Sequence, residues 1–138
     1  MRTLIIVVLL LIGVIAAVAV CALLSSACEN EVVQSAWAPR HLWKAVVFQR
    51  DCGATTGFTS QISIIGFWQS VPHGDGTVFV ADTDHGRSKA ASWGGPPVEV
   101  RWLTWRTLEV RYDPASRVFL QNSLVMPVRI TFVPEHQR

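Results

Sequence analysis

The chain has 138 residues, of which 50% are hydrophobic and 16% are charged, and its formal net charge is +2. This near balance excludes the strong basic excess that nucleic-acid-binding domains usually carry. The apolar residues are concentrated at the N-terminus, and the remainder has the length and composition of one small domain. A multidomain enzyme, a coiled coil, a disordered tail and a multi-span transporter are therefore excluded.

Residues 4–24 predict a transmembrane or signal helix. Fifteen of these 21 positions are Leu, Ile or Val, and none is charged. A helix of this length rises about 31 Å, which matches the roughly 30 Å hydrocarbon thickness of a bilayer. Arg2 precedes the segment, whereas Glu29 and Glu31 follow it. The positive-inside rule therefore keeps the N-terminus cytoplasmic and exports residues 29–138.

Three fates of this segment are open from the sequence. The length of the apolar run favours an uncleaved anchor, whereas the small residues at 25–27 are suited to signal cleavage. Residues 24–28 also resemble a bacterial lipoprotein cleavage box, which would make Cys28 a lipidation site. All three fates place residues 29–138 on the same, exported side of the membrane. The predicted location is the bacterial inner membrane facing the periplasm, or a lipid-anchored or exported position in the envelope.

The remainder predicts a mainly β fold, either a small antiparallel meander or a sandwich. The continuous apolar run at 44–48 predicts a strand that is covered on both faces. The alternating patterns at 98–103 and 108–112 each predict a strand with one buried face. Further strands are predicted at 61–65, 77–81, 118–120 and 128–133.

These patterns divide the chain into three predicted parts. Residues 1–28 form the membrane anchor or signal segment, and residues 42–138 form the antiparallel β domain. Residues 29–41 are mixed in character and lack a clear periodicity. They are therefore predicted to be a spacer between the membrane and the domain.

The stretch 44–58, KAVVFQRDCGATTGF, resembles the core of a family of short uncharacterised bacterial exported or lipoprotein-like proteins. The segments 78–82 and 100–110 also look similar to that family, so the resemblance covers roughly residues 43–112. It implies an envelope domain and brings no catalytic residue. The chain departs from the family upstream, where Ala-Pro-Arg-His at 38–41 replaces a Ser-Pro-Asp-Gly-type turn.

Two cysteines on the exported side, Cys28 and Cys52, can form a disulfide in an oxidising compartment. Closing a loop of about 25 residues would stabilise the fold by roughly 3 kcal/mol, and lipidation of Cys28 would prevent this bond. The alternative is that Cys52 is a catalytic nucleophile. Such a cysteine needs an oriented base, and the four histidines lie in no recognisable motif. The structural interpretation is therefore favoured.

No cofactor or metal is predicted. The one group with metal-ligand chemistry lacks the spacing of a calcium loop or a zinc motif. Its members are typical turn residues: His73, Asp75, Asp82, Asp84 and His85. The segment 53–57 lacks the Gly-Lys-Ser/Thr of a phosphate-binding loop, so it is predicted to be a glycine-bounded connection between strands.

A candidate interaction surface is predicted around this connection, together with tryptophans near loops and strand ends. Its residues are Arg50, Asp51, Gly53, Thr55, Thr56, Trp68, Trp93 and Trp105. The sequence thus favours a non-catalytic binding or inhibitory module that acts on an envelope protein partner. A thiol-dependent envelope enzyme that uses Cys52 and a purely structural envelope protein are the alternatives. Nucleic acid is not an expected partner.

Overall fold

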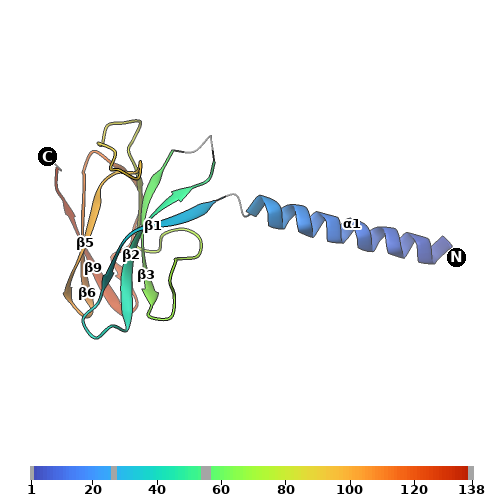
Figure 1. Ribbon diagram of the computed structural model, residues 1–138, viewed down its shortest axis with the longest axis horizontal. Coiled ribbons are helices and arrows are strands. Elements are labelled where there is room, and N and C mark those ends of the chain that lie inside the picture. Colours follow the sequence, from blue (N-terminus) through green and yellow to red (C-terminus); the bar gives the residue numbers. More distant parts are fainter. Residues whose placement is uncertain (1, 26–27, 54–56, 137–138) are drawn as a thin grey trace.

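The computed structural model describes residues 2–25, 28–53 and 57–136, and the described chain is mainly β (Figure 1). It begins with one helix, α1 (Arg2–Ser25). The helix side chains that are described, from Leu4 to Val20, are all exposed. The helix therefore adds nothing to the core of the β domain. Over the described residues, no helix combines the length and apolarity that a bilayer crossing requires.

The strands form a two-layer sandwich (Figure 1), which agrees with the mainly β prediction. The five-stranded sheet has the order β1-β2-β3-β4-β7, and the four-stranded sheet has the order β5-β6-β9-β8. The first sheet consists of β1 (Glu29–Trp37), β2 (Trp43–Asp51), β3 (Thr59–Gly66), β4 (Phe79–Asp82) and β7 (Arg117–Gln121). The second consists of β5 (Val98–Thr104), β6 (Thr107–Tyr112), β8 (Leu124–Val125) and β9 (Val128–Pro134).

One strand pair departs from the antiparallel prediction. β6 and β9 are parallel, with Leu108 opposite Ile130 and Val110 opposite Phe132. The connection between them, residues 113–127, crosses to the five-stranded sheet as β7 and returns through β8. A crossover of this length is what a parallel pair requires, because a tight hairpin can only join antiparallel strands.

The core lies between the two sheets and is built from the alternating side chains that face inward. Val47 and Ile62 of the first sheet are fully buried, as are Leu108 and Val110 of the second. The other buried members are Ala45, Val78, Phe79, Ala81, Val98, Val100, Val128 and Ile130. Burial of these apolar side chains is the main favourable term for the fold.

β2 is buried on both faces, as its continuous apolar run predicts. Val46 and Phe48 face away from the sandwich core, yet neither is accessible to solvent. The segment 67–78 lies across this outer face, and two side chains of β3 accept hydrogen bonds from its backbone. The Gly76 backbone N–H donates to Gln61 Oε1 at 2.6 Å, and the Thr77 N–H donates to Ser63 Oγ at 3.1 Å.

Residues 29–41 differ from the predicted spacer, because Glu29–Trp37 form β1 and pair with β2 along its length. The register shifts between Val32 and Gln34, so the strand contains a bulge. A bulge interrupts the two-residue alternation of inward and outward side chains. This interruption explains why the segment lacks the sequence pattern of a strand, although Val33 and Ala36 pack against the core.

Candidate interaction surface

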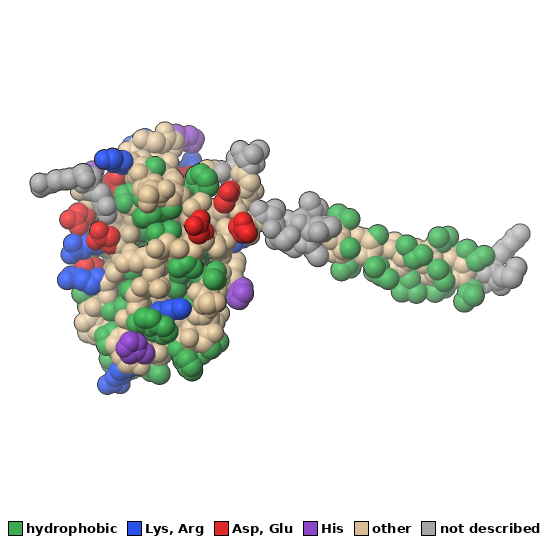
Figure 2. Space-filling model, in the orientation of Figure 1, with side chains coloured by type: hydrophobic (Ala, Val, Ile, Leu, Met, Phe, Trp, Pro, Cys, Tyr) green, Lys and Arg blue, Asp and Glu red, His purple; other side chains and the backbone are tan. Residues whose placement is uncertain are grey.

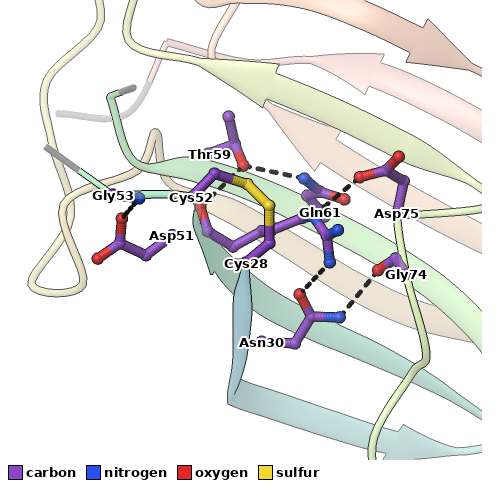
Figure 3. Close-up of a disulfide and its surroundings, with 10 residues drawn as sticks. Cys28, Asn30, Asp51, Cys52, Gly53, Thr59, Gln61, Gly74 and Asp75 are labelled. Carbon is purple, nitrogen blue, oxygen red and sulfur yellow. Dashed lines mark hydrogen bonds and ion pairs between the residues drawn. A yellow bond between two sulfur atoms is a disulfide. The ribbon is translucent and has the colours of Figure 1, made fainter. Parts of the chain in front are cut away.

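Cys28 and Cys52 form a disulfide with a Cα–Cα separation of 4.0 Å, which confirms the predicted pairing (Figure 3). The bond lies where β1 begins and β2 ends, because Glu29 is the register partner of Asp51. It therefore joins the first residues after α1 to the second strand of the sheet. The sulfur that lipidation of Cys28 would modify is occupied by this bond.

Arg50 belongs to a structural network near the disulfide, in which it contacts Asn30 and Asp75. Its Nε pairs with the Asp75 carboxylate at 2.9 Å, and its Nη1 donates to Asn30 Oδ1 at 2.8 Å. Asn30 Nδ2 in turn donates to the carbonyl oxygens of Pro72 at 3.0 Å and Gly74 at 2.8 Å. The Arg50 side chain is only 17% exposed. It attaches the segment 67–78 to β1 and offers little surface to a partner.

The rest of the predicted surface near the disulfide is also used within the fold. Asp51 Oδ1 accepts a hydrogen bond from the Gly53 N–H at 2.9 Å, and Gly53 has a φ of 100°, which favours glycine. Trp93 Nε1 donates to Ser60 Oγ at 2.8 Å, so this indole helps to close the end of the sandwich. Thr55 and Thr56 lie outside the described residues.

The predicted surface residues do not lie together. Arg50 is opposite Thr59 at the disulfide end of the β2–β3 pair, whereas Trp43 is opposite Gly66 at the other end. Trp68 follows Gly66, and Trp105 lies in the β5–β6 turn that contacts Trp43. The structure thus separates Trp68 and Trp105 from the other described members, which lie at the disulfide end.

The end of the sandwich opposite the disulfide, here called the distal end, is formed by four turns. They join β1 to β2, follow β3, join β5 to β6 and join β8 to β9, and they comprise residues 38–42, 67–69, 105–106 and 126–127. Two backbone contacts hold them together: the Phe67 N–H donates to the Leu42 carbonyl at 3.2 Å, and the Arg129 N–H donates to the Arg106 carbonyl at 2.8 Å.

An apolar groove of about 350 Å³ opens at the distal end. Its rim is unusually exposed, since Trp68 has 73% and Met126 has 80% of its surface accessible. A Cβ atom on Gly66 would lie 2.5 Å from the Trp68 ring, so the indole can lie against the backbone only because residue 66 is glycine. The groove is lined by Leu42, Trp43, Ile64, Ile65, Gly66, Phe67, Trp68, Val125, Met126 and Pro127.

Trp105 lies beside this groove, and two guanidinium groups lie over its ring. Its ring stacks on Trp43 with centroids 6.0 Å apart, and Trp43 Nε1 donates to the Trp105 carbonyl at 3.0 Å. The guanidinium carbons of Arg40 and Arg106 lie 4.8 and 4.5 Å from the Trp105 ring centroid. Both distances are within the range of a cation–π interaction.

Charge is distributed unevenly along the sandwich. The four distal turns contain Arg40, His41 and Arg106, but none of the ten acidic residues. In the view of Figure 2, the acidic side chains lie in the upper part of the β domain, at the level of the link to α1, together with several basic ones. The lower end shows apolar, basic and histidine side chains and no acidic one in this view. The distal end therefore combines exposed aromatic and apolar side chains with positive charge.

Several acidic side chains elsewhere are paired with arginines within the fold. Asp82 Oδ1 accepts a hydrogen bond from Arg117 Nε at 3.2 Å, and Arg111 Nε donates to Glu109 at 2.9 Å. Burial would raise the pKa of Asp82, but the hydrogen bonds from Arg117 and from the Asp84 N–H outweigh it and lower that pKa. The hydrogen bond from Arg111 lowers the pKa of Glu109.

Cys52 and three of the acidic residues considered for metal binding have structural partners. Cys52 is half of the disulfide, so it presents no thiolate. Asp75 pairs with Arg50, and Asp82 pairs with Arg117. Among the described residues, no three His, Cys, Asp or Glu side chains are grouped to hold a metal ion.

The sequence-based prediction of the surface missed Leu42, Phe67 and Met126, and it missed both arginines over Trp105. A signal for them does exist in the sequence. Turn positions are usually polar, and here several of them carry large apolar side chains with no acidic residue nearby.

Comparison of the chain with protein-family models, curated proteins and solved structures finds no match.

Proposed function

We propose that this chain is a membrane-anchored, extracytoplasmic β sandwich that binds or inhibits an envelope protein through its distal end, without catalysing a reaction. The apolar groove with its exposed rim is the observation that carries this proposal. Tryptophan, methionine and arginine are the residue types enriched at protein–protein interfaces, whereas acidic residues are depleted there. The distal end has this composition.

The energetics of the rim support binding. Aromatic side chains that enter a partner's pocket supply a large share of the binding energy of an interface. Phe67 and Trp68 contact each other edge to face, with centroids 5.1 Å apart, and both are exposed. In the free protein these two side chains are in contact with water. A partner that buries them gains the favourable free energy of removing apolar surface from water.

Anchoring through α1 completes the proposal. Residues 4–24 of the helix carry no charge and are mostly Leu, Ile and Val, and the described side chains of α1 are exposed rather than packed on the β domain. Disulfides such as Cys28–Cys52 form and persist in oxidising compartments. Tethering a domain to a membrane raises its effective concentration near envelope partners, so a modest contact surface is sufficient for binding.

The first test concerns the anchor. The full chain should stay with membranes during alkaline carbonate extraction, and a reporter at its C-terminus should be active outside the cytoplasm. The double substitution Leu11→Arg and Ile15→Arg should release the chain, because each arginine near the centre of a span costs about 2.5–3.5 kcal/mol. Leu11→Ala with Ile15→Ala serves as the control and should stay in the membrane. A cytosolic C-terminal reporter would contradict the proposed location.

The second test concerns the distal end. A photoreactive phenylalanine analogue at position 68 of the full chain should form one discrete protein adduct in the native cell envelope. The same analogue at position 119 provides the matched control, because Phe119 on β7 is also exposed, at 58%. The substitution Leu42→Glu should abolish the adduct from position 68 while changing the melting temperature little, since Leu42 is exposed. Equal adducts from positions 68 and 119 would argue against a specific surface.

A further inference from the structure

Neither guanidinium group over Trp105 forms an ion pair with a carboxylate in the described part of the chain. Among the described residues, the ion pairs of the fold involve other arginines, at the disulfide end and on the four-stranded sheet. Arg40 and Arg106 are both exposed, and the side chain of each lies against the Trp105 ring. Because the two guanidinium carbons lie 4.8 and 4.5 Å from the centroid of the same ring, their positive charges are close together, and an anion that contacts both would offset their mutual repulsion.

The turn that places Arg40 over Trp105 has an unusual backbone conformation. Arg40 has a φ of 82° and His41 has a φ of 54°, in the left-handed region that favours glycine. Residues other than glycine populate this region sparsely, so the backbone is strained where a side chain is present. In the same turn, the His41 N–H donates to the Ala38 carbonyl at 2.9 Å, which closes the turn and directs Arg40 over Trp105.

We propose that Arg40 and Arg106 form an anion site that receives a carboxylate of an acidic segment whose neighbouring apolar side chain enters the groove. This inference rests on the proposed function, and it specifies the chemistry of the partner. Trp43 connects the two parts, because it lines the groove and stacks on Trp105. Guanidinium groups bind carboxylates with charge-assisted, often bidentate hydrogen bonds. The absence of acidic residues from the distal turns removes internal competitors.

A peptide segment suits this surface better than a lipid surface. A flat membrane would contact the protruding tips of Trp68 and Met126, but it would not require a concave apolar site beside two guanidinium groups. An extended acidic peptide with one apolar anchor can occupy both features at once, because its side chains project in different directions along the backbone. Lipid binding is nevertheless a measurable alternative, and the experiment below includes it.

The probe is a synthetic pentapeptide in which one phenylalanine stands between two pairs of glutamates, titrated into the full chain held in phosphatidylcholine nanodiscs. Tryptophan fluorescence or calorimetry reports binding. We expect affinity to fall when lysines replace the glutamates or when serine replaces the phenylalanine. Arg40→Gly and Arg106→Gln should each weaken binding about five- to tenfold. Arg87→Gln, which removes an exposed arginine near the other end, should leave binding unchanged.

Arg40→Gly separates binding from folding. Because glycine is preferred at a φ of 82°, the melting temperature should stay the same or rise while affinity for the acidic peptide falls. Equal binding of the glutamate and lysine peptides, no binding up to millimolar concentrations, or selective binding of phosphatidylglycerol vesicles would each overturn the inference. The proposed function has a separate readout: an undiminished adduct from position 68 in Arg40→Gly would retain it while rejecting the anion site.

Discussion

Replacing Phe48 with alanine should lower the free energy of unfolding by about 3–5 kcal/mol. Phe48 lies on the outer face of the five-stranded sheet, yet it is fully buried, and the segment 67–78 crosses that face with hydrogen bonds to Gln61 and Ser63. Removing its ring would leave a cavity that the hydrogen-bonded segment cannot readily fill. Denaturant unfolding of the full chain, followed by tryptophan fluorescence, measures the change.

The control for this substitution is Val32→Ala. Val32 is the register partner of Phe48 on the adjacent strand and is 38% exposed, so its truncation should cost less than about 1 kcal/mol. If Phe48→Ala were as mild as Val32→Ala, the segment 67–78 would not cover the sheet in solution. That result would also remove the structural role assigned to Arg50, because its pairing with Asp75 holds the same segment in place.

Replacing both Cys28 and Cys52 with serine should lower the stability of the folded chain by about 3 kcal/mol. The bond joins residues 24 apart in sequence, and a crosslink of this span restricts the unfolded chain by roughly that amount in the chain-entropy model. The loss should appear as a lower denaturation midpoint, and reduction of the unmodified chain with dithiothreitol should reproduce it.

Two further variants test whether the loss of stability comes from the disulfide itself. Cys52→Ser alone and the double variant should be equally destabilised, because either change removes the same bond. Cys21→Ser, which lies within α1, should leave the stability of the β domain unchanged. An intact mass that carries two acyl chains on Cys28 would contradict the disulfide, since the same sulfur would then be blocked.

Much of the β architecture could be predicted from the sequence because alternation is a local property. Val98, Val100, Leu108 and Val110 face the core as their two-residue spacing predicts. β1 was not predicted, because its bulge breaks the alternation and its cross-strand partners are distant in sequence. The parallel pairing of β6 with β9 depends on a crossover, and spacing along the chain carries no signal of that kind.

The candidate site was harder to predict because it depends on which turns meet. Arg50 lies near the end of β2 and Trp93 lies in a loop, which are places where functional residues often occur, yet both side chains hold the fold together. The distal groove assembles Leu42, Trp68 and Met126 from three separate turns, and only the register of the two sheets brings them together. The acid-free composition of those turns was visible in the sequence, but its meaning required their proximity.

The position of the disulfide determines how tension on α1 would reach the sandwich. Without it, a pull at Glu29 would load the first cross-strand pair of β1 and β2 and open the strands one pair at a time, like a zipper. With Cys28 bonded to Cys52, the load enters the end of β2 through a covalent link and bypasses that pair. The disulfide would thereby protect the sandwich from strand-by-strand separation if α1 were pulled.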